Sequence, residues 1–255
     1  MKRLVQLSLL TLLAAAALGT ASAPAFAGST VSDLHRIGKS RSDSTNWSGY
    51  AAYDRVFTHV EGDWNVPTAD CSQMKGNQLS IAAAFVGLDG YDSRTVEQAG
   101  TDSDCIGKEA FYVAWYEFYP ERAIFLDENV YPVEPADHMH AEVTVTGDTA
   151  RLTLQNVTAD WTLTPAPERT SASFEFSSAE WILEAPSNKL TDFGSMTFFN
   201  ASATSGSTTG DIDSFSPFDA IRMVKKGRRS NPTPRATPSA LTIGGSAFSV
   251  DWNNY

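Results

Sequence analysis

Two glutamates, Glu180 and Glu184, lie four residues apart in the segment Ser178-Ala179-Glu180-Trp181-Ile182-Leu183-Glu184. Successive side chains of a β-strand point to opposite faces, so Glu180, Ile182 and Glu184 would share one face. Carboxyl groups held together in a partly desolvated groove change each other's pKa, which is how proteins make acid–base catalysts. The segment predicts a strand whose polar face either meets solvent, the simpler interpretation of the segment alone, or lines a catalytic cleft.

The signatures of several hydrolase classes are missing. The sequence has no Gly-x-Ser-x-Gly elbow, no His-Glu-x-x-His helix and no Asp-Thr-Gly or Asp-Ser-Gly. His138 and His140 could share one strand face, but no third ligand is evident for a zinc site. We therefore expect a surface histidine pair, no metal and no cofactor.

Six short segments are individually weak and collectively specific. They are Asn46-Trp47-Ser48-Gly49-Tyr50-Ala51, Trp64-Asn65-Val66-Pro67, Phe85-Val86-Gly87-Leu88-Asp89-Gly90, Val96-Glu97-Gln98-Ala99-Gly100, Ala114-Trp115-Tyr116-Glu117-Phe118-Tyr119-Pro120 and Ala179-Glu180-Trp181-Ile182-Leu183-Glu184. In this order and spacing they closely resemble the glutamic peptidases of the G1, or eqolisin, family. The resemblance runs from about Asn46 to Trp252.

The resemblance implies a fold and a catalytic dyad. The fold would be an antiparallel β-sandwich of two large sheets, lectin-like (concanavalin-like) in outline. The motifs place the dyad at Gln98 and Glu180. Glu180 would act as general base and then general acid, and the neutral amide of Gln98 would position the water and stabilise the oxyanion. We expect a secreted acid endopeptidase, and a bacterial member of the family.

Further residues are expected around the cleft, where they would bind substrate or tune the dyad: Asp89, Asp102, Glu117, Tyr119, Phe85 and Trp47. Glu184 is expected to be a neighbour that raises the pKa of Glu180. Phe85 and Phe118 stand where fungal members usually carry tryptophan, and the turn from Asp89 to Gln98 is one residue shorter. Both differences bear on cleft shape.

The remaining sequence is rich in β signals. No segment shows a sustained helical period with caps at both ends. Many short strands separated by turn residues predict an all-β sandwich or barrel in one domain, residues 45–255. Predicted strands fall at 46–53, 79–88, 110–119, 141–146, 151–157, 171–176, 179–184, 195–203, 218–224, 240–243 and 247–252. The basic, proline-containing stretch 225–235 is expected to be an exposed loop.

Residues 1–27 are typical of a secretory signal peptide, with Lys2 and Arg3 before an apolar run. The expected cleavage site is Ala25-Phe26-Ala27, with Ala21-Ser22-Ala23 as the alternative. Residues 28–44 read as a flexible leader or short propeptide. Removing the signal leaves 17 basic against 30 acidic residues, a net charge of −13. Such acidity disfavours binding to nucleic acid and anionic membranes. It either suits an acidic milieu or simply keeps a secreted protein soluble.

Cys71 and Cys105 are the only cysteines, and in an exported chain we expect them to form a disulfide. The expected partners are protein or peptide substrates. We predict a monomer, with no nucleic acid and no membrane after signal cleavage.

Two other functions fit a β-sandwich. Aromatic-rich strands stack on sugars and carboxylate pairs cleave them, so a glycan-binding protein or glycosidase is the main alternative. The Glu-x-Asp-x-x-Glu strand motif of lectin-like glucanases is absent. A non-catalytic adhesion domain is the third possibility, and the presence of both Gln98 and Glu180 argues against it.

Overall fold

The structure, a computed structural model, describes residues 43–187, 189–225, 231–242 and 244–255. The expected signal peptide and most of the expected leader lie outside these residues. Asp43 and Ser44, assigned to the leader from sequence, form strand β1 (Asp43–Ser44), which pairs in parallel with β16 (Phe218–Lys225). Both oxygens of Asp43 accept hydrogen bonds from Arg222, at 3.0 Å each, so these two residues belong to the folded domain.

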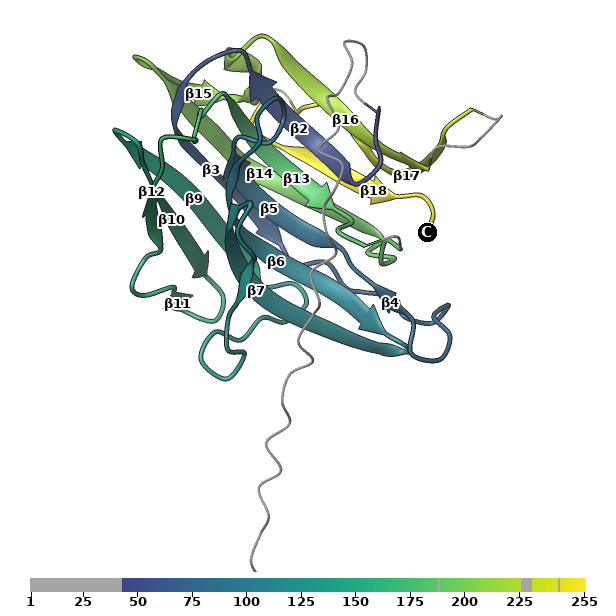
Figure 1. The fold of residues 1–255 in the computed structure, drawn as a ribbon. Helices are drawn as coiled ribbons and strands as arrows, with labels where there is room; N and C mark the ends of the chain where they lie inside the picture. Colours follow the sequence, from purple (N-terminus) through teal and green to yellow (C-terminus); the bar gives the residue numbers. More distant parts are fainter. Residues whose placement is uncertain (1–42, 188, 226–230, 243) are drawn as a thin grey trace, which may run out of the picture.

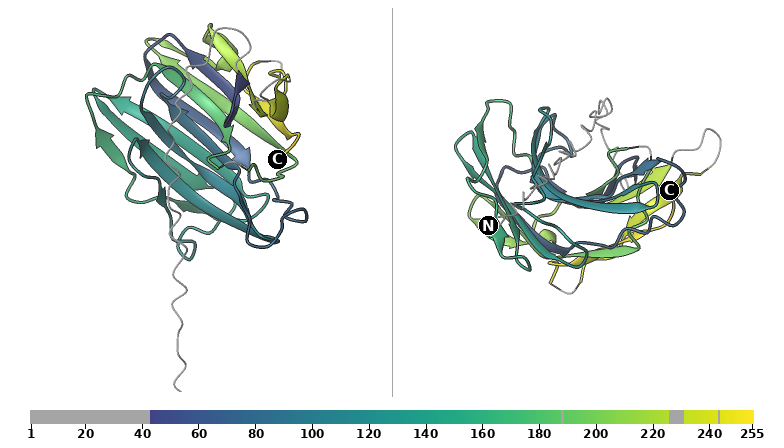
Figure 2. Two further views of the ribbon diagram at one scale, coloured as in Figure 1. Left: turned by 45° about the vertical axis from the view of Figure 1, so that its right-hand side comes forward. Right: turned by 90° about the horizontal axis from the view of Figure 1, so that it is seen from below.

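Two antiparallel sheets, one stacked on the other, make up the domain (Figure 1). Seen from below, both layers are curved, and one sheet lies on the inner side of the curve (Figure 2). The strands of this inner sheet run, in spatial order, β16, β2 (Trp47–Tyr53), β13 (Ser178–Glu184), β5 (Ala83–Leu88), β6 (Val96–Ile106), β7 (Glu109–Tyr119) and β8 (Ile124–Phe125), with β4 (Leu79–Ser80) beside the end of β6.

The outer sheet is built from the rest of the strands. Its strands run, in spatial order, β10 (Thr149–Asn156), β9 (His138–Thr146), β3 (Phe57–Asn65), β14 (Ser195–Ser205), β18 (Phe248–Trp252), β17 (Thr233–Pro238) and β16. Two short strands, β11 (Trp161–Thr162) and β12 (Glu168–Thr170), pair with the outer edge of β10. Strand β15 (Thr208–Asp211) pairs with the second half of β14 and is followed by the short helix η1 (Ile212–Ser214). Strand β16 belongs to both sheets, since its first half pairs with β2 and its second half with β17. A register shift at Met223 and Val224 marks the change, as at the corners of other sandwiches.

Strand alternation sorts the side chains of the inner sheet between two faces. In β13, Ala179, Trp181 and Leu183 face the outer sheet and join the main core. The indole of Trp181 donates to the carbonyl of Glu61 at 2.8 Å, and Trp64 donates to the hydroxyl of Thr101 at 3.0 Å, so both large rings are buried with their N–H groups satisfied. The opposite face of β13 carries Glu180, Ile182 and Glu184, as predicted.

The expected all-β architecture is confirmed, and two predicted strands are wrong. Residues 171–176 form a turn and an irregular segment, because the carboxylate of Asp89 takes the backbone N–H groups that a ladder would use. Residues 240–242 are not a strand either, and residue 243 lies outside the described part. The basic stretch 225–235 connects β16 to β17, with residues 226–230 outside the described part.

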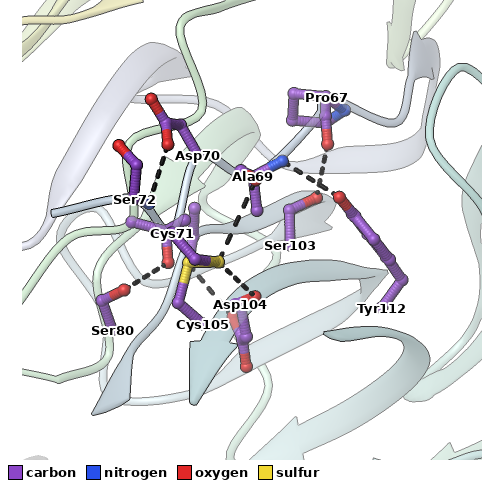
Figure 3. Close-up of a disulfide and its surroundings, with 12 residues drawn as sticks. Pro67, Ala69, Asp70, Cys71, Ser72, Ser80, Ser103, Asp104, Cys105 and Tyr112 are labelled. Atoms are coloured by element: carbon purple, nitrogen blue, oxygen red, sulfur yellow. Dashed lines mark hydrogen bonds between the residues drawn. A yellow bond between two sulfur atoms is a disulfide. The ribbon is translucent and has the colours of Figure 1, made fainter. Parts of the chain in front are cut away.

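The predicted disulfide is confirmed: Cys71 is bonded to Cys105 (Figure 3). It ties the loop after β3 to the end of β6. Hydrogen bonds beside it hold the same loop, from Ser103 Oγ to the carbonyl of Pro67 at 3.1 Å and from the Ala69 amide to the hydroxyl of Tyr112 at 3.0 Å. Within the described residues, no helix is long and apolar enough to cross a membrane.

Candidate active site

One row of residues, which includes Glu180, crosses the face of the inner sheet that points away from the outer sheet. In order along the row these are Asp219 of β16, Ala51 of β2, Glu180 of β13, Gly87 of β5, Gln98 of β6 and Glu117 of β7. Residues directly opposite each other on paired strands point to the same face, so the polar side chains of this row converge. The strands concerned lie side by side in the middle of Figure 1.

Gly87 separates Gln98 from Glu180 without filling the space between them. Two strand spacings place the Cα atoms of Gln98 and Glu180 about 10 Å apart, a gap that two long side chains can span from both sides. A Cβ atom at Gly87 would lie 3.1 Å from the Cβ of Gln98 and 3.0 Å from the carbonyl of Glu97. The glycine therefore keeps a space open above the sheet, between an amide and a carboxyl group.

The amide of Gln98 is held by its other neighbour in the row. Its Nε2 donates to Oε2 of Glu117 at 2.6 Å, and Gln98 is nearly fully buried. The Oε1 atom of Gln98 is buried with no hydrogen-bond partner among the described residues. A primary amide has two N–H donors, so one remains for a bound molecule after Glu117 has taken the other.

Glu180 has no solvent-exposed surface, and neither of its carboxyl oxygens has a hydrogen-bond partner among the described residues. Burial raises the pKa of Glu180 well above its ordinary value, and the nearby carboxyls of Asp89 and Glu97 raise it further. Glu184 does not act on Glu180 in the way expected from sequence. It lies two rows further along, beyond Ile182, where its charge raises the pKa of Asp102.

The turn after β5 covers Glu180. The backbone of Tyr91 is among the groups that act on the Glu180 carboxyl, and its ring belongs to the same apolar cluster as Ile182 and Ala51. The Tyr91 hydroxyl donates to the carboxylate of Asp219 at the other end of the row. Gly90, at φ +101°, leaves no room for a side chain, since a Cβ there would lie 2.8 Å from the Trp47 indole. The turn is thus held against β16 at the Asp219 end of the row.

Asp89 begins this turn in a left-handed conformation, at φ 67°, and is fully buried. Its Oδ2 accepts from the amides of Glu175 and Phe176 and from the hydroxyl of Thr95, at 3.0, 2.8 and 3.2 Å. Its Oδ1 accepts from the amide and hydroxyl of Ser177 at 2.8 and 3.1 Å. Asp89 thus anchors the chain that enters β13 and leaves no oxygen free for a substrate.

Three carboxyl groups lie around Gln98 and around the apolar cluster beside it, which includes Trp47, Phe85 and Trp115. Burial raises the pKa of Glu117 to about 7, of Glu184 to about 7 and of Asp102 to about 8. Each has a donor: Gln98 for Glu117, Asn46 at 2.8 Å for Glu184, and the Trp115 indole for Asp102. In acidic solution all three are neutral, so the exposed face of the inner sheet then carries little charge.

A sequence profile described as the peptidase A4 family matches residues 45–237. The chain belongs to this family. It is 29% identical to aspergillopepsin-2 of Aspergillus niger over 67% of its own length and 68% of the relative's. It is 32% identical to scytalidopepsin B of Scytalidium lignicola over 55% of this chain and 51% of that one.

Solved structures of this family share the fold. Scytalido-glutamic peptidase with a transition state analog inhibitor superposes with a TM-score of 0.66 and 23% identity, over 82% of this chain and 99% of that one. Aspergilloglutamic peptidase from Aspergillus niger superposes with a TM-score of 0.54 and 26% identity, over 68% and 99%. The prediction of a glutamic-type endopeptidase of the eqolisin family is thereby confirmed.

The residues named from sequence lie along the row, beside it and at the end of β7. The structure brings Gln98, Glu180 and Glu117 into one row, with Asp102 four residues further along β6 on the same face. Trp47 and Phe85 lie in the apolar cluster beside the row, in edge-to-face contact with ring centroids 5.7 Å apart. Further along the chain, Tyr119 lies two residues after Glu117, at the end of β7 and opposite Val96.

Sequence reasoning missed three residues. Tyr91 and Asp219 carry no motif, and only the folded sheet places them at the row. Glu97 offered a signal, because an acidic residue directly before Gln98 must point into the sandwich if Gln98 points out.

The predicted histidine pair lies on the outer sheet, away from the row. His140 Nδ1 lies 2.6 Å from Asp63 Oδ1, and Asn200 donates to the other oxygen of Asp63 at 2.6 Å. His138 lies 3.5 Å from the same carboxylate. Within the described residues no group of three or more His, Cys, Asp or Glu side chains is arranged to hold a metal ion.

Proposed function

We propose that this protein is a secreted acid endopeptidase in which Glu180 and Gln98 act directly on the peptide bond. The observation that supports the roles is the row Glu180–Gly87–Gln98, in which a carboxyl and a neutral amide flank an empty position on one sheet face. The bacterial origin, the signal peptide and the monomeric state remain predictions.

In this proposal Glu180 handles protons. It accepts a proton from a water molecule as the water oxygen attacks the scissile carbonyl carbon, and it then gives a proton to the leaving nitrogen as the C–N bond breaks. Substrate reaches Glu180 when the turn carrying Tyr91 moves aside. Contact with water then brings the carboxyl towards its ordinary pKa, at which the ionised base exists in acidic solution.

Gln98 stabilises the oxyanion. Glu117 fixes one N–H of the amide, which orients the other towards the space above Gly87. A single preorganised donor of this kind contributes roughly 3–4 kcal/mol to lowering the barrier in other acyl-transfer enzymes. An amide keeps its two donors at any pH, so it serves an enzyme that works in acid.

The neutral state of Glu117, Glu184 and Asp102 gives a physical reason for an acidic rate maximum. Below about pH 7 these groups carry little charge, so they do not repel the developing oxyanion. As the pH rises through their pKa values, negative charge collects around the reaction centre and the rate should fall.

The test is digestion of casein between about pH 2 and 8 by the wild type, Glu180→Gln, Gln98→Ala and the control Glu109→Gln, which changes an exposed residue at the start of β7. We expect the first two variants to lose at least about a hundredfold in kcat/KM, in line with removal of a catalytic donor or base. Full activity in either would refute the assigned roles. Cleavage of a β-glucan without cleavage of casein would favour the glycosidase alternative, which the family match does not support.

A further inference from the structure

Glu97 is an acidic residue inside the sandwich, directly before Gln98 in β6. It is fully buried, and its cross-strand neighbours are Leu88 of β5 and Phe118 of β7. Among the described residues neither carboxyl oxygen of Glu97 makes a hydrogen bond of ordinary geometry, although the side chains of Asp89 and Thr95 lie close enough to change its pKa. An ionised carboxylate in such surroundings costs several kcal/mol, so the site fits the neutral acid.

The charged groups that act on Glu97 are both acids. Burial raises the pKa of Glu97 to about 10, and the nearby carboxylate of Asp89 is the next cause. Glu180 is the second acid within its electrostatic reach. The ion pairs formed by the described residues include none with Glu97, so no cation compensates a charge there.

Asp89 connects Glu97 to both residues of the proposed dyad. Its five accepted hydrogen bonds join the end of β5, Thr95 before β6 and the residues that lead into β13. Gln98 lies three residues after Thr95, and Glu180 lies three residues after Ser177. Five donors satisfy one carboxylate, and a second negative charge on the neighbouring Glu97 would repel it with no cation between them.

We propose that neutral Glu97 is a positioning residue, which allows the Asp89 network to hold Gln98 and Glu180 in register, and that its ionisation opens this end of the sandwich. This inference rests on the proposed function for its catalytic part and on the fold alone for its structural part. When Glu97 loses its proton, two negative charges lie side by side in the interior. The cheapest relief is separation of the segment 175–177 from the turn after β5, which moves Glu180 away from Gln98.

The test replaces Glu97 by side chains that cannot ionise. Glu97→Gln has the shape of the neutral acid, Glu97→Met is an apolar substitute of similar length, and Glu109→Gln is the matched control, since it removes an exposed carboxyl of β7. Thermal unfolding is followed between about pH 4 and 8, and kcat and KM are measured separately on a peptide substrate at about pH 4 and 7.

At about pH 4 we expect Glu97→Gln to match the wild type within about twofold in kcat/KM, because the native residue is neutral there. Between about pH 4 and 7 the Tm of the variant should fall by about 10 °C less than that of the wild type, because over this range the unfolded wild-type chain loses the Glu97 proton and the folded chain keeps it. Closed Glu97 stays neutral up to about pH 10, but in the opened state it ionises near its ordinary pKa of about 4.3, so opening becomes easier with each pH unit above that value. Glu97→Gln removes this effect, so the ratio of kcat at pH 7 to kcat at pH 4 should rise about tenfold, with KM unchanged.

Several outcomes would overturn the inference: identical Tm-against-pH curves for Glu97→Gln and the wild type, an equal shift in the Glu109→Gln control, or failure of both neutral variants to fold at about pH 4. If the wild type cleaves no protein at any pH, the proposed function fails. The Tm comparison still decides the structural role of Glu97 in that case.

Discussion

Gln98 and Glu180 leave the inner sheet on the same face, two strands apart, and the residue between them is Gly87. The amide and the carboxyl can therefore approach one bound molecule from opposite sides. The turn after β5 carries Tyr91, whose hydroxyl donates to Asp219 at the end of the same row and so fixes the turn in place. The proposed dyad and the turn that borders it are thus tied to a single row of the sheet.

A side chain at Gly87 should block the space between the dyad. In Gly87→Ala, the new Cβ would lie 3.1 Å from that of Gln98 and push the amide from its position. We expect kcat/KM to fall on the order of a hundredfold, since small misplacements of catalytic groups have effects of this size. The measurement is steady-state kinetics, with near-UV circular dichroism to establish that the variant is folded. Unchanged kcat/KM in a folded Gly87→Ala protein would contradict the arrangement described.

Removing the Glu117 carboxyl, which accepts the hydrogen bond of Gln98, should lower activity. Replacing it by a neutral amide that can still accept this bond should not. In Glu117→Ala the amide loses its 2.6 Å hydrogen bond, and we expect a roughly fivefold to tenfold loss of kcat at acidic pH. Glu117→Gln keeps an acceptor oxygen and removes a group whose pKa is raised to about 7. Its activity should match that of the wild type in acid and persist to higher pH. A pH–rate profile identical to that of the wild type would argue against a role for Glu117.

Stability should be greatest in acid. Glu97, Asp102, Glu117 and Glu184 have folded pKa values raised to between about 7 and 10. A raised acid binds more protons in the folded state, so its stabilising effect is complete below its unfolded pKa of about 4.3 for Glu and about 3.9 for Asp. That effect is lost as the pH rises towards the folded value.

A smaller set of groups works in the other direction at low pH. The pKa of Glu142 is lowered to about 2 by its hydrogen bond to His59, so its contribution is present above about 4.3 and lost as the pH falls to about 2. Together the two sets place maximum stability between about pH 3 and 5. Calorimetry between about pH 2 and 8 measures it, and a Tm that peaks near neutral pH would contradict the assignment of neutral interior acids.

Loss of the disulfide should lower the stability of the fold without displacing Gln98 and Glu180. Cys71 and Cys105 are 34 residues apart, and closing a loop of that size contributes on the order of 3–4 kcal/mol in the chain-entropy model. The double variant Cys71→Ser/Cys105→Ser should therefore unfold about 10 °C below the wild type. Below its Tm it should keep kcat/KM within about twofold. A large loss of kcat/KM at a temperature where the variant is folded would show that the disulfide also shapes the site.

Residue type and strand alternation were enough to identify part of the site from sequence. The face shared by Glu180, Ile182 and Glu184 follows from period-two alternation, which local sterics impose on any strand. Gln98 emerged only through its motif, because a lone glutamine has no local signature of reactivity. Strand β6 itself was not predicted. Its segments Ala99-Gly100-Thr101 and Asp102-Ser103-Asp104 contain residues with low strand propensity, Ala, Gly and Asp. Pairing with β5 on one side and β7 on the other stabilises it as a strand.

The sequence by itself determined the all-β class, the disulfide, the family and the identity of the proposed dyad, since these depend on residue types and on short-range spacing. Only the tertiary structure decided how the strands are ordered in the sheet. That order sets Gly87 between Gln98 and Glu180, brings Asp219 to Tyr91, and turns Asp89 into an anchor and Glu97 into a buried acid. Pairing between distant strands is a property of the whole packed core, and no local pattern encodes which strand will be the neighbour of another.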